Sequence, residues 1–146
     1  MPSLNFTKFV DEVECGLKTQ TIRRTRKRPI KAGDRLHLFA GARTKHCRRL
    51  SPPGGATCYY VADIEIYRHP YYFGVGVKLD GVACSINEGR AIIVDDGFES
   101  ESSFFDFFVP NIGDVFHGYL IRWDWWGDPI DARDPKIWKP VTEATR

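Results

Sequence analysis

The sequence predicts an α+β domain, a small and mostly antiparallel β-barrel with flanking helices. Three kinds of pattern lead to this fold class. Several short segments alternate polar and apolar residues, as half-buried strands do. Other segments repeat apolar residues with the period of a helix. Strands and helices do not alternate regularly along the chain, which argues against a parallel βαβ sheet.

A helix over residues 5–15 is the first element that the sequence predicts. Apolar residues recur at helical spacing from Phe6 to Val13 and would form one buried face. Asn5 is the expected N-cap. Gly16 is expected just after the last turn, because glycine adopts the left-handed backbone conformation at little cost.

Strands follow the helix. The expected strands are 18–23, 35–40, 58–67, 71–79, 82–85 and 116–123. The clearest is 35–40, whose alternation turns Leu36 and Leu38 to one side. Asp80-Gly81 is a strong signal for a hairpin turn.

A second helix is expected to begin at Glu99 or Ser100. Its inward-facing residues would be Phe104, Phe105, Phe107 and Phe108. The segment 91–94 is short and apolar, and residues 124–146 are expected to form a C-terminal surface tail.

The length and composition predict a single domain over residues 1–146. With 42% hydrophobic and 14% aromatic residues, the chain can bury a sizeable core. No apolar run is long enough to span a membrane, and the N-terminus lacks the apolar core of a signal peptide. A cytoplasmic location is therefore expected.

The four cysteines do not predict a metal site. Cys15, Cys47, Cys58 and Cys84 form no CxxC pair, and no His stands at ligand spacing from them. We expect reduced thiols, no metal and no cofactor.

Charge is strongly segregated along the chain. Residues 18–49 contain twelve Lys and Arg against the single acid Asp34, a net charge of +11, and the remainder carries −9. Such segregation produces a local positive field that attracts nucleic acid, although a solvated basic face without a partner is the alternative. The candidate nucleic-acid-binding residues are Arg23, Arg24, Arg26, Lys27, Arg28, Arg43, Lys45, Arg48 and Arg49.

The segment 6–41 resembles the opening of the ASCH domains, which are relatives of the PUA domains. The shared pattern is Gly-x-Lys-Thr-x-Thr-Ile-Arg followed by Gly-Asp, found here from Gly16 to Arg23 and at Gly33-Asp34. DGFESESSFFDFF is similar to the family's acid-Gly-Phe segment, and GYLIRW to its closing strand. The resemblance spans roughly residues 4–123, with an unmatched middle from about 50 to 90. The segment GARTKHCRRL is similar to that of ASCH proteins encoded in phages and prophages.

The resemblance implies a PUA-like barrel with a cleft for RNA or nucleotides. One branch of the family removes acetyl groups from N4-acetylcytidine with a Lys, a Thr and a Glu. The Lys and Thr correspond to Lys18 and Thr21, and Asp96 stands near the position of the Glu. Another member has ribonuclease activity.

The chemistry of an amidohydrolase would assign roles to these residues. Thr21 would be the nucleophile, Lys18 the base if its surroundings lower its pKa, and Asp96 the acid or orienting group. Residues three apart in a straight strand point to opposite faces, so Lys18 and Thr21 cooperate only if the chain bends between them. For each of them an ordinary structural role is the alternative.

The leading hypothesis is a binding module for RNA, single-stranded nucleic acid or a modified nucleotide, with the 18–24 segment lining a basic cleft. An amidohydrolase or a ribonuclease is the rival hypothesis. A protein-binding accessory factor using the aromatic segment 123–126 is the third. Tyr59, Tyr60, Tyr71, Tyr72, Trp125 and Trp126 are candidates for stacking on bases.

Overall fold

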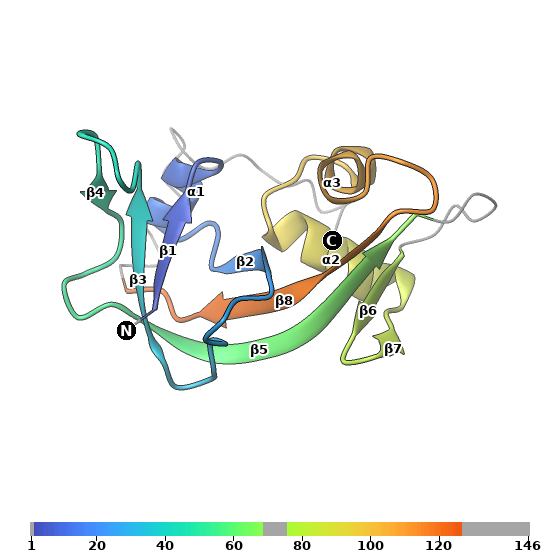
Figure 1. The fold of residues 1–146 in the computed structure, drawn as a ribbon, viewed down its shortest axis with the longest axis horizontal. Coiled ribbons are helices and arrows are strands. Elements are labelled where there is room, and N and C mark those ends of the chain that lie inside the picture. Colours follow the sequence, from blue (N-terminus) through green and yellow to red (C-terminus); the bar gives the residue numbers. More distant parts are fainter. Residues whose placement is uncertain (1, 69–75, 127–146) are drawn as a thin grey trace. The chain divides into compact units, whose positions relative to one another are not determined.

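The structure, a computed structural model, describes residues 2–68 and 76–126. Its strands form a mostly antiparallel sheet of eight strands, accompanied by three helices within the described residues (Figure 1). The elements are β1 (Ser3–Phe6), α1 (Val10–Cys15), β2 (Gln20–Arg24), β3 (Arg35–Ala40), β4 (Arg48–Arg49), β5 (Ala56–Tyr67), β6 (Val77–Leu79), β7 (Val82–Ala83), α2 (Ile86–Asp95), α3 (Glu101–Phe108) and β8 (Val115–Trp123).

The chain divides into two compact units. Among the described residues, the first unit contains 2–21, 28–61 and 121–126, and the second contains 22–27, 62–68 and 76–120. The expectation of a single domain stays a prediction. Most of the expected tail, residues 127–146, lies outside the described residues.

The sheet is open, so the prediction of a barrel is wrong in that respect, while the α+β class and the mainly antiparallel pairing are confirmed. The strand order is β1-β3-β5-β6-β7; β4 also pairs with β3, and β8 pairs with β2 and β5. Closure would require the end strands to pair. Among the described residues no pairing joins β1 to β7, and β7 has only two residues, both exposed.

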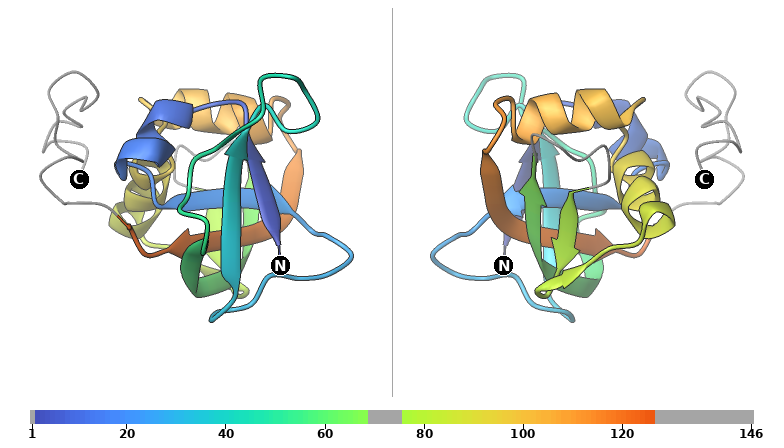
Figure 2. Two further views of the ribbon diagram at one scale, coloured as in Figure 1. Left: turned by 90° about the vertical axis from the view of Figure 1, so that its left-hand side faces the viewer. Right: turned by 90° about the vertical axis from the view of Figure 1, so that its right-hand side faces the viewer.

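The first unit contains a layer built on β3. This strand has the predicted bounds, and Leu36, Leu38 and Ala40 are buried as expected from their alternation. β1 pairs with it in parallel, with Leu4 opposite Leu38, and Figure 2 shows these two strands side by side. The ring of Trp123, from β8, packs edge-on at 6.0 Å from Phe6.

The predicted helix over 5–15 is wrong in its first half. Leu4 and Phe6 are buried in a strand, and the helix begins only at Val10. Asn5 is not the N-cap; its side-chain oxygen accepts a hydrogen bond of 2.9 Å from the backbone N–H of Ala42. The parallel pairing with β3 overrides the local helical period, because it satisfies the backbone polar groups and buries two side chains.

The second unit is built around β5, β6 and a cluster of phenylalanines. Asp80 and Gly81 both have positive φ, and they join β6 to β7 as the predicted hairpin turn. Phe98 lies 5.3 Å from Phe104, and Phe108 lies 4.9 Å from Phe116.

Two helices complete the second unit and lie next to each other in Figure 1. The predicted helix start is confirmed, since Ser100 caps α3 with a hydrogen bond from the Ser103 backbone. Phe104 and Phe105 are buried as expected, but Phe107 is exposed. α2 was not predicted as a helix, because its ten residues include a central Gly89 and only a short apolar run.

Candidate functional site

Lys18 is buried in the first unit, with 3% of its surface exposed. Lysine is almost never buried this deeply without a stabilising environment. Its backbone N–H donates to the carbonyl of Glu12 in the last turn of α1, and its Nζ lies 5.2 Å above the ring of Phe9. The face of an aromatic ring attracts a cation.

A sharp reversal of the chain precedes Lys18. Gly16 follows α1 with φ of 86°, in the predicted left-handed conformation. The indole of Trp125 lies against it so closely that a Cβ at this position would be 2.4 Å from Cδ2. Only glycine fits both the backbone angle and this contact. The turn at Gly16, two residues before Lys18, is therefore tightly constrained.

Thr21 is buried with 5% exposure, on the strand that follows. The strand was predicted over 18–23 but runs from Gln20 to Arg24. Lys18 thus stands before the strand, and the straight-strand geometry that would separate its side chain from that of Thr21 does not hold between them. Gln20, Thr21 and Ile22 are buried in succession, so both faces of this strand are covered.

Gln20 and Arg122 form a polar contact that the sequence did not indicate. Arg122 Nε donates to Gln20 Oε1 at 3.2 Å, and its guanidinium lies 5.0 Å above the ring of Tyr60. The two residues are 102 positions apart, so no local pattern could pair them.

Asp96 is buried in the second unit with 4% exposure. It stands at the C-cap of α2, where its backbone N–H donates to Ile92. A carboxylate is unfavourable there, since the negative end of the helix dipole repels it. Arg23 is the cation that interacts with it: burial lowers the pKa of the Arg23 guanidinium, Asp96 opposes this shift, and Arg26 adds to it.

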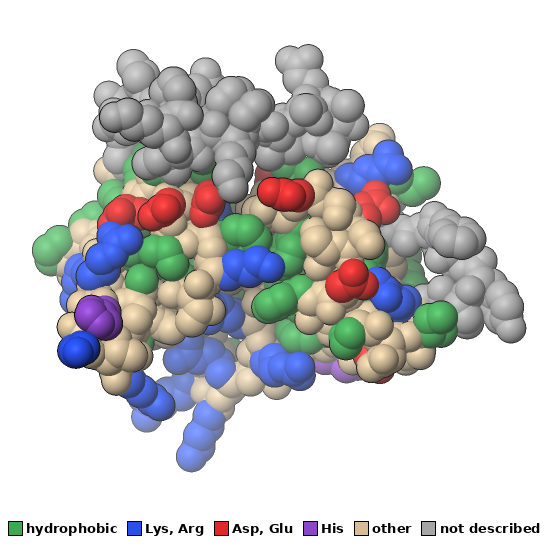
Figure 3. Space-filling model, turned by 90° about the horizontal axis from the view of Figure 1, so that it is seen from above, with side chains coloured by type: hydrophobic (Ala, Val, Ile, Leu, Met, Phe, Trp, Pro, Cys, Tyr) green, Lys and Arg blue, Asp and Glu red, His purple; other side chains and the backbone are tan. Residues whose placement is uncertain are grey.

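Most of the predicted basic residues are exposed. Arg23 is half-buried; the exposed ones are Arg24, Arg26, Lys27, Arg28, Arg43, Lys45, Arg48 and Arg49. Figure 3 shows Lys and Arg side chains extending into solvent along the lower edge of the view. Figure 2 shows the loop between β3 and β4 standing clear of the strands.

Three of these cations have contacts of their own. Arg24 lies 5.0 Å above the ring of Phe116. Arg48 forms an ion pair with Glu14. Arg49 lies 4.8 Å above the ring of Phe39, and its Nη1 is 2.7 Å from Nδ1 of His37.

The other five predicted cations have no carboxylate partner in the described part of the chain. Arg26, Lys27, Arg28, Arg43 and Lys45 form no ion pair with any residue that the structure describes. A polyanion could supply the opposite charge that these side chains lack among the described residues.

The stacking candidates differ in their surroundings. Tyr59 is 53% exposed. The rings of Trp125 and Trp126 lie 4.4 Å apart, tilted by 41°, and the buried indole N–H of Trp125 has no hydrogen-bond partner in the described part of the chain. Tyr71 and Tyr72 lie outside the described residues.

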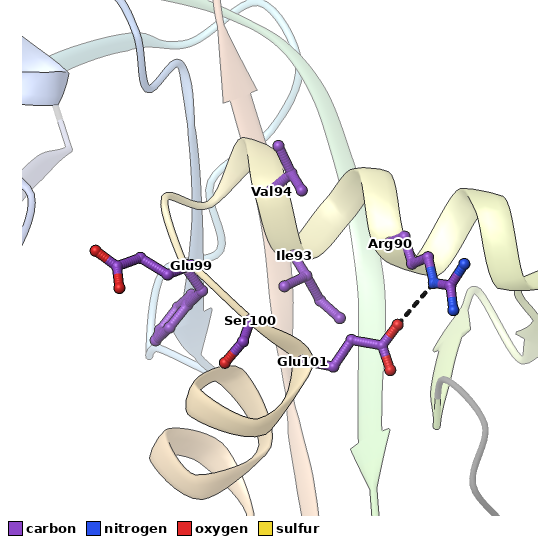
Figure 4. A pocket seen from close by; sticks show the side chains of 7 residues that line it. Arg90, Ile93, Val94, Glu99, Ser100 and Glu101 are labelled. Carbon is purple, nitrogen blue, oxygen red and sulfur yellow. Dashed lines mark hydrogen bonds and ion pairs between the residues drawn. The ribbon is translucent and has the colours of Figure 1, made fainter. Parts of the chain in front are cut away.

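A small pocket of about 280 Å³ opens between α2 and α3. Its lining residues are Arg90, Ile93, Val94, Phe98, Glu99, Ser100 and Glu101. Arg90 and Glu101 form an ion pair of 2.8 Å beside it, and the Glu99 carboxylate points away from that pair (Figure 4). None of the predicted site residues lines this pocket.

Residues 2–68 and 76–126 contain no group of His, Cys, Asp and Glu able to hold a metal ion. Cys15, Cys47, Cys58 and Cys84 are free thiols. No helix in the same two ranges is both long and apolar enough to cross a bilayer.

Comparison of the chain with models of protein families, with curated proteins and with solved structures finds no match. The resemblance to the ASCH domains thus rests on the motifs of the sequence alone.

Proposed function

We propose that this protein is an ASCH-like, PUA-type domain that binds RNA, single-stranded nucleic acid or a modified nucleotide. One observation carries the proposal: Arg26, Lys27, Arg28, Arg43 and Lys45 are exposed and form no ion pair within the described residues. Arginine and lysine on loops suit phosphate, since the planar guanidinium binds it through two parallel hydrogen bonds.

Binding to labelled single-stranded RNA at several salt concentrations tests the proposal. Each phosphate contact contributes about 0.7 to the log–log salt slope on single strands. The double variant Arg26→Gln/Arg28→Gln is expected to weaken binding and to reduce the slope by up to about 1.4. The control Lys78→Gln/Arg90→Gln removes the same charge from β6 and α2 and should leave the slope unchanged. Equal effects of both variants, or no binding by the wild type to RNA or DNA, would contradict the proposal.

A second candidate is an amidohydrolase acting on an N4-acylated cytosine. The observation that favours it is burial: all three residues expected from the resemblance, Lys18, Thr21 and Asp96, are among the few buried polar residues of the described chain. Buried ionisable groups are frequent at catalytic sites. In this reading Thr21 Oγ attacks the acetyl carbonyl carbon, and Lys18 takes the hydroxyl proton, which requires that it first release the proton that the Phe9 ring favours. The departing amine takes that proton from Lys18 and leaves as cytidine, and water then hydrolyses the acetyl ester on Thr21 to release acetate.

Incubation with N4-acetylcytidine, followed by chromatography of cytidine, tests this second candidate. Wild-type protein is expected to release cytidine, and Lys18→Ala and Thr21→Val to abolish release. Lys31→Ala, at an exposed position, is the control. If folded wild-type protein gives no cytidine, the deacetylase assignment fails. Cleavage of RNA in a parallel incubation would instead favour a ribonuclease.

A further inference from the structure

One face of the sheet in the first unit combines aromatic rings with cations. Along β3, Arg35, His37 and Phe39 point away from the buried Leu36 and Leu38. The strand register adds neighbours on the same side, because directly paired residues share a face. Arg49 of β4 is paired with Phe39, and Thr57 of β5 is paired with Arg35.

Tyr59 extends this face. It stands two residues after Thr57 on β5, and successive odd positions of a strand project to the same side. Its ring is 53% exposed, whereas Cys58 beside it is buried. We define the outer sheet face as Arg35, His37, Phe39, Arg49, Thr57 and Tyr59.

Arg49 is held in place on this face. Its guanidinium lies over the Phe39 ring at 4.8 Å, and its Nη1 meets His37 Nδ1 at 2.7 Å. Arginine can only donate a hydrogen bond, so Nδ1 must accept and the His37 proton resides on Nε2. Two partners thus restrain a side chain that would otherwise be flexible, which lowers the entropy lost when a ligand is bound.

The charge of the face is of one sign. β1, β3, β4 and residues 56–61 of β5 contain no Asp or Glu. Arg35 and Arg49 are both exposed, and the β3–β4 loop beside the face adds Arg43 and Lys45. An anion that also offers flat aromatic surfaces complements such a face.

We infer that the outer sheet face is a stacking platform for single-stranded RNA, an inference that rests on the proposed nucleic-acid binding. Unpaired bases stack on aromatic rings and on guanidinium planes, while phosphates pair with arginines. Tyr59, Phe39 and the Arg49 plane supply the stacking surfaces. Ser3, which is paired with His37, and Thr57 present hydroxyls on the same face that can donate and accept hydrogen bonds, as recognition of the ribose 2′-hydroxyl requires.

The test is fluorescence anisotropy of a labelled, unstructured CA-repeat RNA with Tyr59→Leu and Phe39→Leu. Each variant is expected to raise Kd by about five-fold to about a hundredfold, the loss that removal of one stacking partner causes. The salt slope should stay as in the wild type, because no cation is lost. Phe107→Leu is the matched control, an exposed aromatic of the second unit at 59% exposure, and it should bind like the wild type.

The outcomes separate this inference from the proposed function. If RNA binding depends on Arg26 and Arg28 but Tyr59→Leu and Phe39→Leu bind normally, the platform is refuted and the proposed function stands. If the wild type binds no nucleic acid, both fail. Equal loss on duplex RNA, whose bases are already paired, would refute stacking. Equal affinity for DNA of the same sequence would refute the preference for RNA. Because Tyr59 is exposed, its variant tests the platform even if Phe39→Leu unfolds.

Discussion

Gly16→Ala is expected to destabilise the protein through two separable effects. The backbone φ of 86° costs an L-residue about 1–2 kcal/mol. The added methyl would also lie 2.4 Å from Cδ2 and 2.6 Å from Cε2 of Trp125, roughly 1 Å inside ordinary carbon contact. Overpacking of this kind costs about 1–3 kcal/mol. Alanine also reduces the conformational entropy of the unfolded chain relative to glycine, which opposes this loss of stability by about 0.4–1 kcal/mol.

The net loss expected for Gly16→Ala is therefore roughly 1–5 kcal/mol in the free energy of unfolding. Urea denaturation followed by tryptophan fluorescence measures it. Gly33→Ala is the matched control, because Gly33 also has a positive φ, of 97°, but a methyl there meets no atom within 4 Å. It isolates the backbone effect, and its expected loss is about 1 kcal/mol.

A double variant separates the contact from the backbone angle. In a Trp125→Ala background the added methyl has room, so Gly16→Ala should then cost no more than Gly33→Ala. Equal losses for Gly16→Ala and Gly33→Ala in the wild-type background would refute the close approach of Trp125. Because Lys18 follows this turn, RNA affinity and N4-acetylcytidine hydrolysis measured on the same variants would show whether the turn supports either activity.

Two further predictions concern thiols and helix capping. Burial raises the pKa of the Cys15, Cys58 and Cys84 thiols above 9.0, so a thiol reagent at pH 8 should modify exposed Cys47 first, and Cys47→Ser should remove the fast phase. Several fast-reacting thiols would contradict the expected burial of the other three. As the pH rises above 9.0 the unfolded chain releases these protons before the folded one, so the free energy of unfolding should fall. Ser100→Ala should lower the free energy of unfolding by about 1 kcal/mol, because it removes the cap of α3. The control Ser102→Ala, inside the helix, should change it by less than about 0.5 kcal/mol. Thermal unfolding compares the two variants, and equal effects would count against the cap.

Local signals predicted the elements whose stabilising contacts are local. β3 was predicted with its bounds because alternation alone reports which side is buried. The cap at Ser100 and the turn at Asp80-Gly81 were also predictable, since their interactions join residues three apart or fewer. The first strand was missed because its partner β3 is about 34 positions away, and that pairing overrode a helical pattern.

Part of the candidate site could be predicted from the sequence and part could not. The charge of +11 over residues 18–49 and the motif around Lys18 and Thr21 were visible without coordinates. The contact of Gln20 with Arg122 was not, because it joins residues 102 positions apart along the chain. Nor was the outer sheet face, although Arg35, His37 and Tyr59 each stood in predicted strands.

The sequence by itself determined the α+β class, the alternation of β3, the start of α3 and the segregation of positive charge, because each of these is encoded within a few neighbouring residues or in composition. The tertiary structure alone decided that the sheet stays open, that Lys18, Thr21 and Asp96 are buried, and that Arg49 lies over Phe39. The physical reason is that burial and strand register arise from contacts between distant segments. Their free energy outweighs the weak local preferences that a single sequence displays.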